Sequence, residues 1–329
     1  MFIFGAMKKI FNLCWLVCLL GLSGPLTILA QPIAFAVHGG AGAADSMKMS
    51  PALRSAISAA LTEAVQTGYA ILEKGGTSLE AVEAAIILLE NSPLFNAGRG
   101  AVTTATGICE LDAAIMDGKT GKAGAVAGLH HIKNPISLAR LVKDSTSHVM
   151  LIGEGAEAFA KTQGVEFVNP LYFLEKSELK GYAPEVYRLH DIKFGTVGAV
   201  ALDKSGNLAA GTSTGGMQGK KFGRVGDVPI IGAGTYANNA TLAVSCTGHG
   251  EYFIREVVGH ELSALVLYKG LSLQAAGDEL IHQRLAPMGG KGGLIAIDKW
   301  GNIHMPFNTP AMLRASKDSK GHLYVRLWQ

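Results

Sequence analysis

Three segments of the chain carry residues that could act as a nucleophile. Gly211-Thr212-Ser213-Thr214-Gly215 matches the pattern Gly-x-Ser-x-Gly, in which a sharp strand-to-helix turn exposes a serine beside an oxyanion hole. The following Gly216-Met217-Gln218-Gly219 is a poor helix start, and so short a pattern arises easily in a glycine-rich chain. Cys246 is a second candidate, but it ends an apolar run at 242–245, which favours a small buried residue over an activated thiolate.

The third candidate is Thr196, which follows Gly195 and opens a run of small residues. A threonine hydroxyl is a weak nucleophile unless a base lies beside it. Cleavage between Gly195 and Thr196 would create an α-amino group, whose ordinary pKa of about 7.7–8.0 lets it act as that base. Glycine before the bond suits cleavage because it tolerates the strained backbone that attack by the hydroxyl requires. From the residues alone, an ordinary strand residue remains the alternative for Thr196.

The elements that must position these residues group into helices and sheets. Apolar residues recur at three- and four-residue spacing over 53–72, and a capping box at 77–80 opens a second helical pattern over 81–89. Helix-strand-helix material is expected over 135–161, and helices over 251–268 and 273–285. Strands are expected at 33–37, 111–116, 123–129, 196–203, 208–214, 228–231, 241–246, 294–298, 303–306 and 323–328. This grouping indicates two packed sheets covered by helices, not a βαβ alternation.

Composition excludes several classes of protein. Of 329 residues, 48% are hydrophobic and 17% charged, which excludes intrinsic disorder. The net charge of +3 comes without a basic stripe, which excludes a typical nucleic-acid binder. No CxxC or HExxH pattern predicts a zinc site. The 42 glycines have no collagen period and therefore need a structural explanation.

The first thirty residues have the pattern of a secretory signal. Lys8-Lys9 is followed by an apolar stretch from Ile10 to Leu22 and by Leu29-Ala30-Gln31, with Ala30/Gln31 the expected cleavage site. A membrane anchor is the alternative, but the apolar run is shorter than the roughly 20 residues needed to span a bilayer. We therefore expect residues 1–30 to be a signal peptide and the protein to be exported, periplasmic or secreted. Cys109 and Cys246 would then remain, and we expect both to be free thiols.

Thr196 lies in a stretch, Gly195-Thr196-Val197-Gly198-Ala199-Val200-Ala201-Leu202-Asp203, that resembles the cleavage site of the plant-type L-asparaginases, also called isoaspartyl peptidases. Phe194-Gly195 stands where some members have His-Asp or His-Gly. Further motifs of that family follow in order over about residues 33 to 310: Val37-His38-Gly39-Gly40-Ala41-Gly42, Phe95-Asn96-Ala97-Gly98, Glu110-Leu111-Asp112-Ala113, Thr212-Ser213-Thr214-Gly215-Gly216, Gly223-Arg224-Val225-Gly226-Asp227, Gly232-Ala233-Gly234, Tyr236-Ala237-Asn238-Asn239 and Ser245-Cys246-Thr247-Gly248-His249-Gly250-Glu251. The resemblance implies an N-terminal-nucleophile hydrolase with an α+β fold, a four-layer αββα sandwich.

The resemblance also implies catalytic roles for matching residues. Thr196 is expected to be the nucleophile and, through its freed amine, the base. Thr214 would lie beside it and help to orient or protonate that amine, and Asn96 would hydrogen-bond near the nucleophile. Thr247 and Gly248 would form the oxyanion hole, where one donor is worth roughly 2.7–4 kcal/mol in a comparable site.

Substrate-binding roles follow in the same way. Arg224 would bind the substrate's α-carboxylate through its guanidinium fork, and Asp227 would bind the α-ammonium. Gly250 would lend a backbone contact to the same head group. Without the resemblance, Arg224 and Asp227 could equally be a surface ion pair. We expect His249 to line the site and His38 to be structural.

The family also holds a sodium ion in a loop through main-chain carbonyls. The matching segment is 89–99, and the expected ligands are the carbonyls of Leu89, Glu90, Ser92, Phe95, Ala97 and Arg99. No cofactor is expected for catalysis.

The resulting hypothesis is an exported, self-cleaving amidohydrolase. Residues 31–195 would form an α subunit of 165 residues and 196–329 a β subunit of 134, one αββα domain made by both and paired as (αβ)2. The substrate would be L-asparagine or an isoaspartyl (β-aspartyl) dipeptide, with no nucleic-acid partner and no membrane association after signal removal. A glycosylasparaginase-like hydrolase and a non-catalytic exported amino-acid-binding protein are the alternatives.

Overall fold

A computed structural model describes residues 32–42, 49–174 and 195–329. The predicted signal peptide, 1–30, lies outside the described residues. Residues 175–194, which precede Gly195 at the predicted cleavage site, also lie outside them. Residues from Pro32 to Gln329 form one compact unit, and the description below concerns that unit alone.

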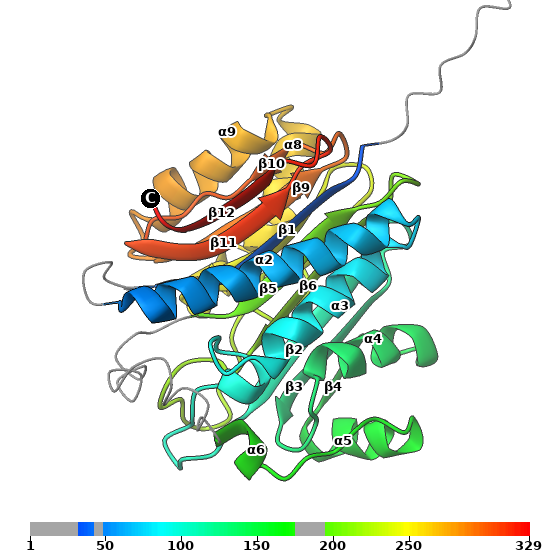
Figure 1. The fold of residues 1–329 in the computed structure, drawn as a ribbon, viewed down its shortest axis with the longest axis vertical. Coiled ribbons are helices and arrows are strands. Elements are labelled where there is room, and N and C mark those ends of the chain that lie inside the picture. Colours follow the sequence, from blue (N-terminus) through cyan, green and yellow to red (C-terminus); the bar gives the residue numbers. More distant parts are fainter. Residues whose placement is uncertain (1–31, 43–48, 175–194) are drawn as a thin grey trace, which may run out of the picture. The chain divides into compact units, whose positions relative to one another are not determined.

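The larger sheet has eight strands (Figure 1), and the predicted nucleophile, Thr196, immediately precedes one of its central strands. Apart from the parallel pair β3–β4, neighbouring strands run antiparallel. Their order across the sheet is β12 (Leu323–Trp328), β11 (Ala311–Lys317), β1 (Ala34–Gly42), β5 (Val197–Leu202), β6 (Leu208–Thr214), β2 (Leu111–Asp117), β3 (Ala123–Leu129) and β4 (Met150–Ile152). Segments distant in sequence therefore meet at its centre, where β1, β5 and β6 lie side by side.

The smaller sheet has four strands and packs against the larger one. Its order is β10 (Ile303–His304), β9 (Gly292–Asp298), β8 (Leu242–Gly248) and β7 (Thr235–Ala237). Val200, Ala210 and Ile295 belong to the apolar core between the two sheets. Many strand residues on these facing surfaces are alanine or glycine, so the sheets can approach closely.

Helices cover the outer face of each sheet. α2 (Pro51–Glu73), α3 (Ser78–Asn91) and α4 (Pro135–Ser145) pack on the larger sheet, as Figure 1 shows, and share a core with Val197 and Ala199. α7 (Gly250–Arg255), α8 (Val258–Tyr268) and α9 (Leu273–Asp278), followed by a π-helical segment at Glu279–Leu285, cover the smaller sheet. Short helices α5 (Gly153–Thr162), α6 (Leu171–Leu174) and the 3-10 turn Gly98–Gly100 complete the described elements. The predicted four-layer αββα sandwich is confirmed.

Two expectations about individual elements were wrong, and one strand was not predicted. Residues 228–230 form a turn and a bend, because Pro229 interrupts the run and Ile230 N donates to Asp227 O at 3.0 Å, and Ile231 makes only an isolated bridge with Thr235. The helix expected over 251–268 breaks at Val257, whose φ of 47° lies in the left-handed region. β11 was not predicted, although it pairs with β1 along nearly its whole length.

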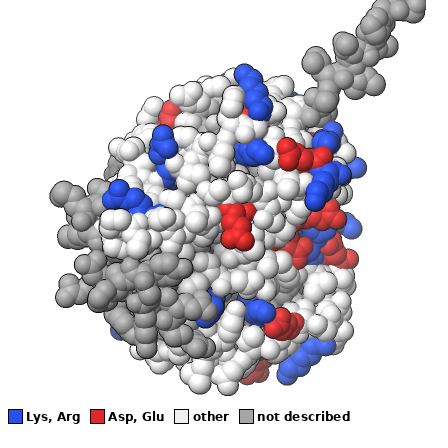
Figure 2. Space-filling model, in the orientation of Figure 1, with Lys and Arg blue, Asp and Glu red and all other residues white. Residues whose placement is uncertain are grey.

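On the face shown in Figure 2, basic and acidic side chains are interspersed. No helix in the described ranges is long and apolar enough to cross a membrane.

Candidate active site

Thr196 and Thr214 face one another across neighbouring strands. Val197 pairs with Ser213 in the antiparallel register of β5 and β6, so Thr196 lies opposite Thr214. Thr196 Oγ1 donates to Thr214 Oγ1 at 3.1 Å, and both residues are buried. Gly216 N donates to the same Thr214 oxygen at 2.9 Å. Thr214 therefore lies beside Thr196, and in the uncut chain its hydroxyl oxygen accepts from the Thr196 hydroxyl.

His38 holds the backbone of Thr196. His38 Nδ1 lies 3.0 Å from the carbonyl oxygen of Thr196, so this nitrogen donates and Nε2, 2.9 Å from Ser245 Oγ, accepts. Burial lowers the pKa of His38 to about 3, against the raising effect of the Thr196 hydrogen bond. The imidazole is therefore neutral and fixes the carbonyl. A Cβ at Gly198 would lie 1.9 Å from Ser245 Oγ, so only glycine fits beside this contact.

Gly195 lies between two segments that leave no room for a side chain. A Cβ on Gly40, whose φ is +107°, would lie 2.3 Å from Gly195 N, and one on Gly195 itself would lie 2.7 Å from Thr247 Oγ1. The register of β1 against β11 shifts between His38 and Gly40, and such irregularities often lie beside active sites. The glycine pair therefore lets the predicted scissile segment lie directly on β1.

Thr247 is close to the predicted cleavage site. Its Oγ1 accepts a hydrogen bond from Ala41 N at 3.1 Å, and its side chain is buried beside Gly195. Gly248 follows at the exposed end of β8 with a φ of +155°. The structure thus brings the two predicted oxyanion-hole residues to the Gly195–Thr196 segment.

Asn96 braces the end of β6 and has no hydrogen bond to Thr196. Its Nδ2 donates to Gly216 O at 2.8 Å, and its Oδ1 accepts from Val102 N at 2.9 Å. Its backbone oxygen accepts from Gly215 N at 3.1 Å. Asn96 therefore holds the turn that follows Thr214. It was expected to hydrogen-bond near the nucleophile, but it is connected to Thr196 only through this turn and Thr214.

Arg224, Asp227 and Gly250 form a second cluster. A Cβ on Gly250 would lie 2.8 Å from Asp227 Oδ1 and 3.0 Å from Arg224 Nη2, so the glycine lies directly on both charged groups. Gly250 is only three residues beyond Thr247, and this short connection places the charged cluster beside the nucleophile cluster. Asp227 is buried, which excludes a simple surface ion pair for these residues.

Asp227 is electrostatically unusual. Its Oδ2 is buried and has no hydrogen-bond partner among the described residues. Burial raises the pKa of this carboxyl to about 7, although its own backbone amide and the Arg224 guanidinium both lower it. A buried carboxylate oxygen without a partner is suited to a cationic ligand, because an ammonium would supply the missing donors.

Glu251, for which the sequence predicted no role, binds Arg224 through two hydrogen bonds. Arg224 Nε donates to Glu251 Oε1 at 2.8 Å and Nη2 to Oε2 at 3.0 Å. The hydrogen bond from Arg224 lowers the pKa of Glu251, so this carboxylate is ionised. Glu251 could have been identified from the sequence, because it directly follows Gly250 and is the last residue of the motif at 245–251.

The other nucleophile candidates are excluded by their surroundings. Ser213 is buried on the helix-facing side of β6 and donates to Glu90 Oε1 at 2.6 Å, so no serine elbow exists. Cys246 is a buried free thiol, as expected, and Cys109 is buried as well. Burial raises the pKa of Cys246 well above its ordinary value, so it is not a thiolate. His249 is exposed at the start of α7.

The loop expected to hold sodium folds tightly after α3. A Cβ on Gly98 would lie 2.4 Å from Glu90 O, and one on Gly100 would lie 1.9 Å from Phe95 O. The carbonyls of Leu89, Phe95 and Ala97 each accept one loop amide and keep a second lone pair. No cluster of three acidic, histidine or cysteine side chains in the described ranges could hold a metal. The donor set that the sequence suggested, main-chain carbonyl oxygens, is of the type that a hard cation prefers.

Comparison with known proteins agrees with this geometry. A family model described as "Asparaginase" matches residues 31–325. The chain is 51% identical to the "Isoaspartyl peptidase" of Escherichia coli (strain K12), over 85% of this chain and 91% of the relative. It is 43% identical to the "Plant-type L-asparaginase" of Pyrococcus horikoshii, over 85% and 94%, and 42% identical to the "Isoaspartyl peptidase/L-asparaginase" of Xenopus laevis, over 88% and 94%. The chain therefore belongs to the plant-type L-asparaginase and isoaspartyl peptidase family.

Proposed function

We propose that the protein releases L-aspartate from L-asparagine and from isoaspartyl dipeptides, using Thr196 as an N-terminal nucleophile. The observation that carries the proposal is the hydroxyl pair of Thr196 and Thr214 beside a glycine-lined peptide bond and a buried charged cluster. The names of the relatives support the same substrates.

The nucleophile is created by self-cleavage between Gly195 and Thr196. Thr196 Oγ attacks the Gly195 carbonyl carbon, the C–N bond breaks, and the nitrogen takes up a proton and becomes the α-amine of Thr196. Water then hydrolyses the resulting ester and frees the hydroxyl. The close packing of Gly195 against Gly40 and Thr247 supports this step, because it confines the scissile segment where the hydroxyl lies. The products are subunits of residues 31–195 and 196–329.

Turnover uses the same hydroxyl on the substrate's side-chain carbonyl. The freed α-amine of Thr196 takes the hydroxyl proton and later gives a proton to the leaving ammonia or amino acid. Thr247 and Gly248 stabilise the oxyanion, and Thr214 keeps the hydroxyl in place. Water then attacks the acyl-enzyme, which releases L-aspartate and regenerates Thr196.

Recognition of the substrate's head group is assigned to the charged cluster. Arg224 binds the α-carboxylate and Asp227 binds the α-ammonium, with Gly250 leaving the space between them open. Removal of the Asp227 carboxylate from water strengthens its attraction for an ammonium. Binding of the substrate's head group to the charged cluster thus fixes the position of the substrate carbonyl that Thr196 attacks.

Three further features belong to the proposal. A sodium ion would be held by the carbonyls of Leu89, Glu90, Ser92, Phe95, Ala97 and Arg99, where it would stabilise the loop that carries Asn96. Two αβ units would pair as (αβ)2. The N-terminal pattern of residues 1–30 supports export through a signal peptide.

The decisive experiment offers the purified, cleaved protein three compounds: L-asparagine, β-aspartyl-leucine and a glycosylated asparagine. We expect L-aspartate from the first two and none from the third. Release from the glycosylated compound alone would assign the chain to the glycosylasparaginase alternative. Binding of L-aspartate without hydrolysis of any compound would assign it to the amino-acid-binding alternative.

A further inference from the structure

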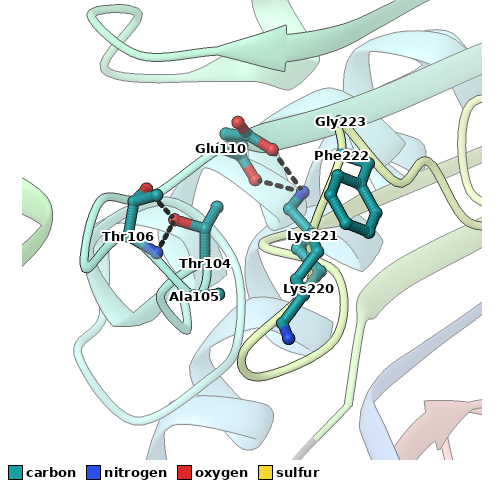
Figure 3. A pocket seen from close by; sticks show the side chains of 8 residues that line it. All are labelled: Thr104, Ala105, Thr106, Glu110, Lys220, Lys221, Phe222 and Gly223. Atoms are coloured by element: carbon teal, nitrogen blue, oxygen red, sulfur yellow. Dashed lines mark hydrogen bonds and ion pairs between the residues drawn. The ribbon is translucent and has the colours of Figure 1, made fainter.

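A pocket of about 280 Å³ lies beyond the ends of β2 and β6 (Figure 3). Residues 104–106 form one wall, residues 220–223 form the other, and Glu110 lies between them. Small-molecule pockets generally have volumes of about 300–1,000 Å³, so this one suits a ligand of the size of a single amino acid.

The pocket borders both clusters of the candidate active site. On one side, Arg224 N donates to Lys221 O at 3.1 Å, so the turn that lines the pocket also carries the head-group arginine. On the other, a Cβ on Gly216 would lie 3.1 Å from Lys220 Nζ. Gly216 in turn donates to Thr214, the partner of the nucleophile. The pocket therefore neighbours both the arginine of the charged cluster and the turn that follows Thr214, as a site for the remaining part of a substrate must.

Phe222 adopts a costly conformation at the mouth of the pocket. Its φ is 58° and that of Gly223 is 66°, and these values with the Arg224–Lys221 hydrogen bond describe a type I′ turn. Asparagine or glycine is the favoured residue at such a position, and strained residues concentrate at functional sites. The ring is nevertheless completely exposed, with a relative accessibility of 102%. An aromatic surface held open in this way suits an apolar ligand group.

Lys221 supplies the available positive charge. The neighbouring Lys220 ammonium is buried, donates to Glu110 O at 3.0 Å and lies 3.6 and 3.9 Å from the carboxylates of Glu110 and Asp112. Lys221 is exposed, and it makes no ion pair within the described part of the chain. The pocket therefore combines an aromatic face with one unpaired ammonium group.

We propose that this pocket binds the leaving amino acid of an isoaspartyl dipeptide. Its α-carboxylate pairs with Lys221, and its side chain packs on Phe222. The inference rests on the proposed function, and it separates the two substrate classes, because the ammonia that leaves asparagine has nothing to place in the pocket.

The carboxylate contact is tested with β-aspartyl-leucine and β-aspartyl-leucine amide. We expect the cleaved wild-type protein to have a kcat/KM about two- to fivefold higher for the free acid, the range of a partly exposed ion pair. Lys221→Gln removes that preference. Lys119→Gln makes the same charge change on an exposed turn between β2 and β3 and keeps the preference.

The aromatic contact is tested by the preference for β-aspartyl-leucine over β-aspartyl-glycine. Phe222→Asn keeps a residue that tolerates a positive φ but removes the ring. We expect this variant to lose about three- to tenfold of the wild-type preference for leucine, the range for part of a buried apolar side chain.

The rate of L-asparagine hydrolysis distinguishes a failure of the proposed subsite from a failure of the proposed function. Unchanged preferences in both variants, with normal turnover of asparagine and dipeptides, would overturn the subsite and leave the proposed function standing. An equal loss for asparagine and the dipeptides would also overturn the subsite, because it would place the two residues in head-group binding or folding. A wild-type protein that hydrolyses no β-aspartyl compound would overturn the proposed function and the subsite together.

Discussion

Thr196 donates its hydroxyl to Thr214 at 3.1 Å, and this contact is set by strand register. Thr214 also pairs with Asp112 on the next strand, so the three residues form a row across β5, β6 and β2. Asp112 is buried, and the nearby Lys220 ammonium opposes the effect of burial, which raises the pKa of this carboxyl. The nucleophile is therefore positioned by the middle of a sheet, with the precision that rigid elements give to a site.

Replacement of Thr214 by valine removes the hydroxyl and nearly preserves the shape. Both the Thr196 hydroxyl and Gly216 N lose their acceptor, and an unsatisfied buried group costs about 1–3 kcal/mol. We expect Thr214→Val to lower the rate of self-cleavage and the kcat for L-asparagine by about 10- to 100-fold. Thr214→Ser keeps the acceptor and should stay within about fivefold of wild type. Equal rates in the valine and serine variants would contradict the role of this hydroxyl.

Removal of the nucleophile should leave one uncut chain. Thr196→Ala lacks the only atom that the proposed cleavage uses as nucleophile, so intact-mass analysis should find the full-length chain and no fragment of residues 196–329. Thr196→Ser keeps a hydroxyl and should still be cut, although more slowly, because serine lacks the methyl group that restricts χ1. Cleavage or hydrolysis that persists in the alanine variant would exclude the mechanism.

Gly40 offers a test of how closely the scissile segment packs. A Cβ at this position would lie 2.3 Å from Gly195 N, so Gly40→Ala must displace one of the two segments. We expect little or no self-cleavage after prolonged incubation, as measured on a denaturing gel.

Gly75→Ala is the matched control for Gly40→Ala. Gly75 also has a positive φ, +86°, but nothing lies within 4 Å of its Cβ position. Alanine at position 75 therefore has the conformational cost of a positive φ, about 1–2 kcal/mol, without a steric clash. Normal cleavage in the Gly75 variant would attribute the Gly40 effect to contact with Gly195; normal cleavage in both would show that the segments do not need to touch.

Local patterns predicted most of the fold. The spacing of apolar residues and the capping box at Thr77 predicted α2 and α3, and the Thr77 side chain accepts from Glu80 N as expected. The pattern was wrong where a tertiary contact decides the structure. The break at Val257 is such a case, because Gly259 N and His260 N donate to the backbone of residues 232–233.

The candidate site was predicted through motif order more than through chemistry. Thr196, Arg224 and Asp227 are separated in sequence, and only the resemblance brought them together before the structure was known. The bidentate contact of Arg224 with Glu251 and the burial of Asp227 Oδ2 depend on the packing of α7 against β8, which no local pattern contains. The pocket lined by 220–223 was not predicted, because only the fold brings its two walls, 104–106 and 220–223, together.

The raised pKa of Asp227 predicts that substrate binding expels a proton. With a pKa of about 7 in the substrate-free chain, this carboxyl is largely protonated at pH 6 and ionised at pH 8. The substrate ammonium binds the ionised form, so KM for L-asparagine should rise as the pH falls below 7, by up to about tenfold per unit for one proton. The ordinary pKa of an α-amine is about 7.7–8.0, but the freed Thr196 amine acts in the chemical step and therefore on kcat, which separates the two groups. Calorimetric titration in two buffers of different ionisation enthalpy should show proton release at pH 6.5, and Asp227→Asn should bind weakly with no release. A KM that stays constant between pH 5.5 and 7.5 would mean that Asp227 is ionised before the substrate arrives.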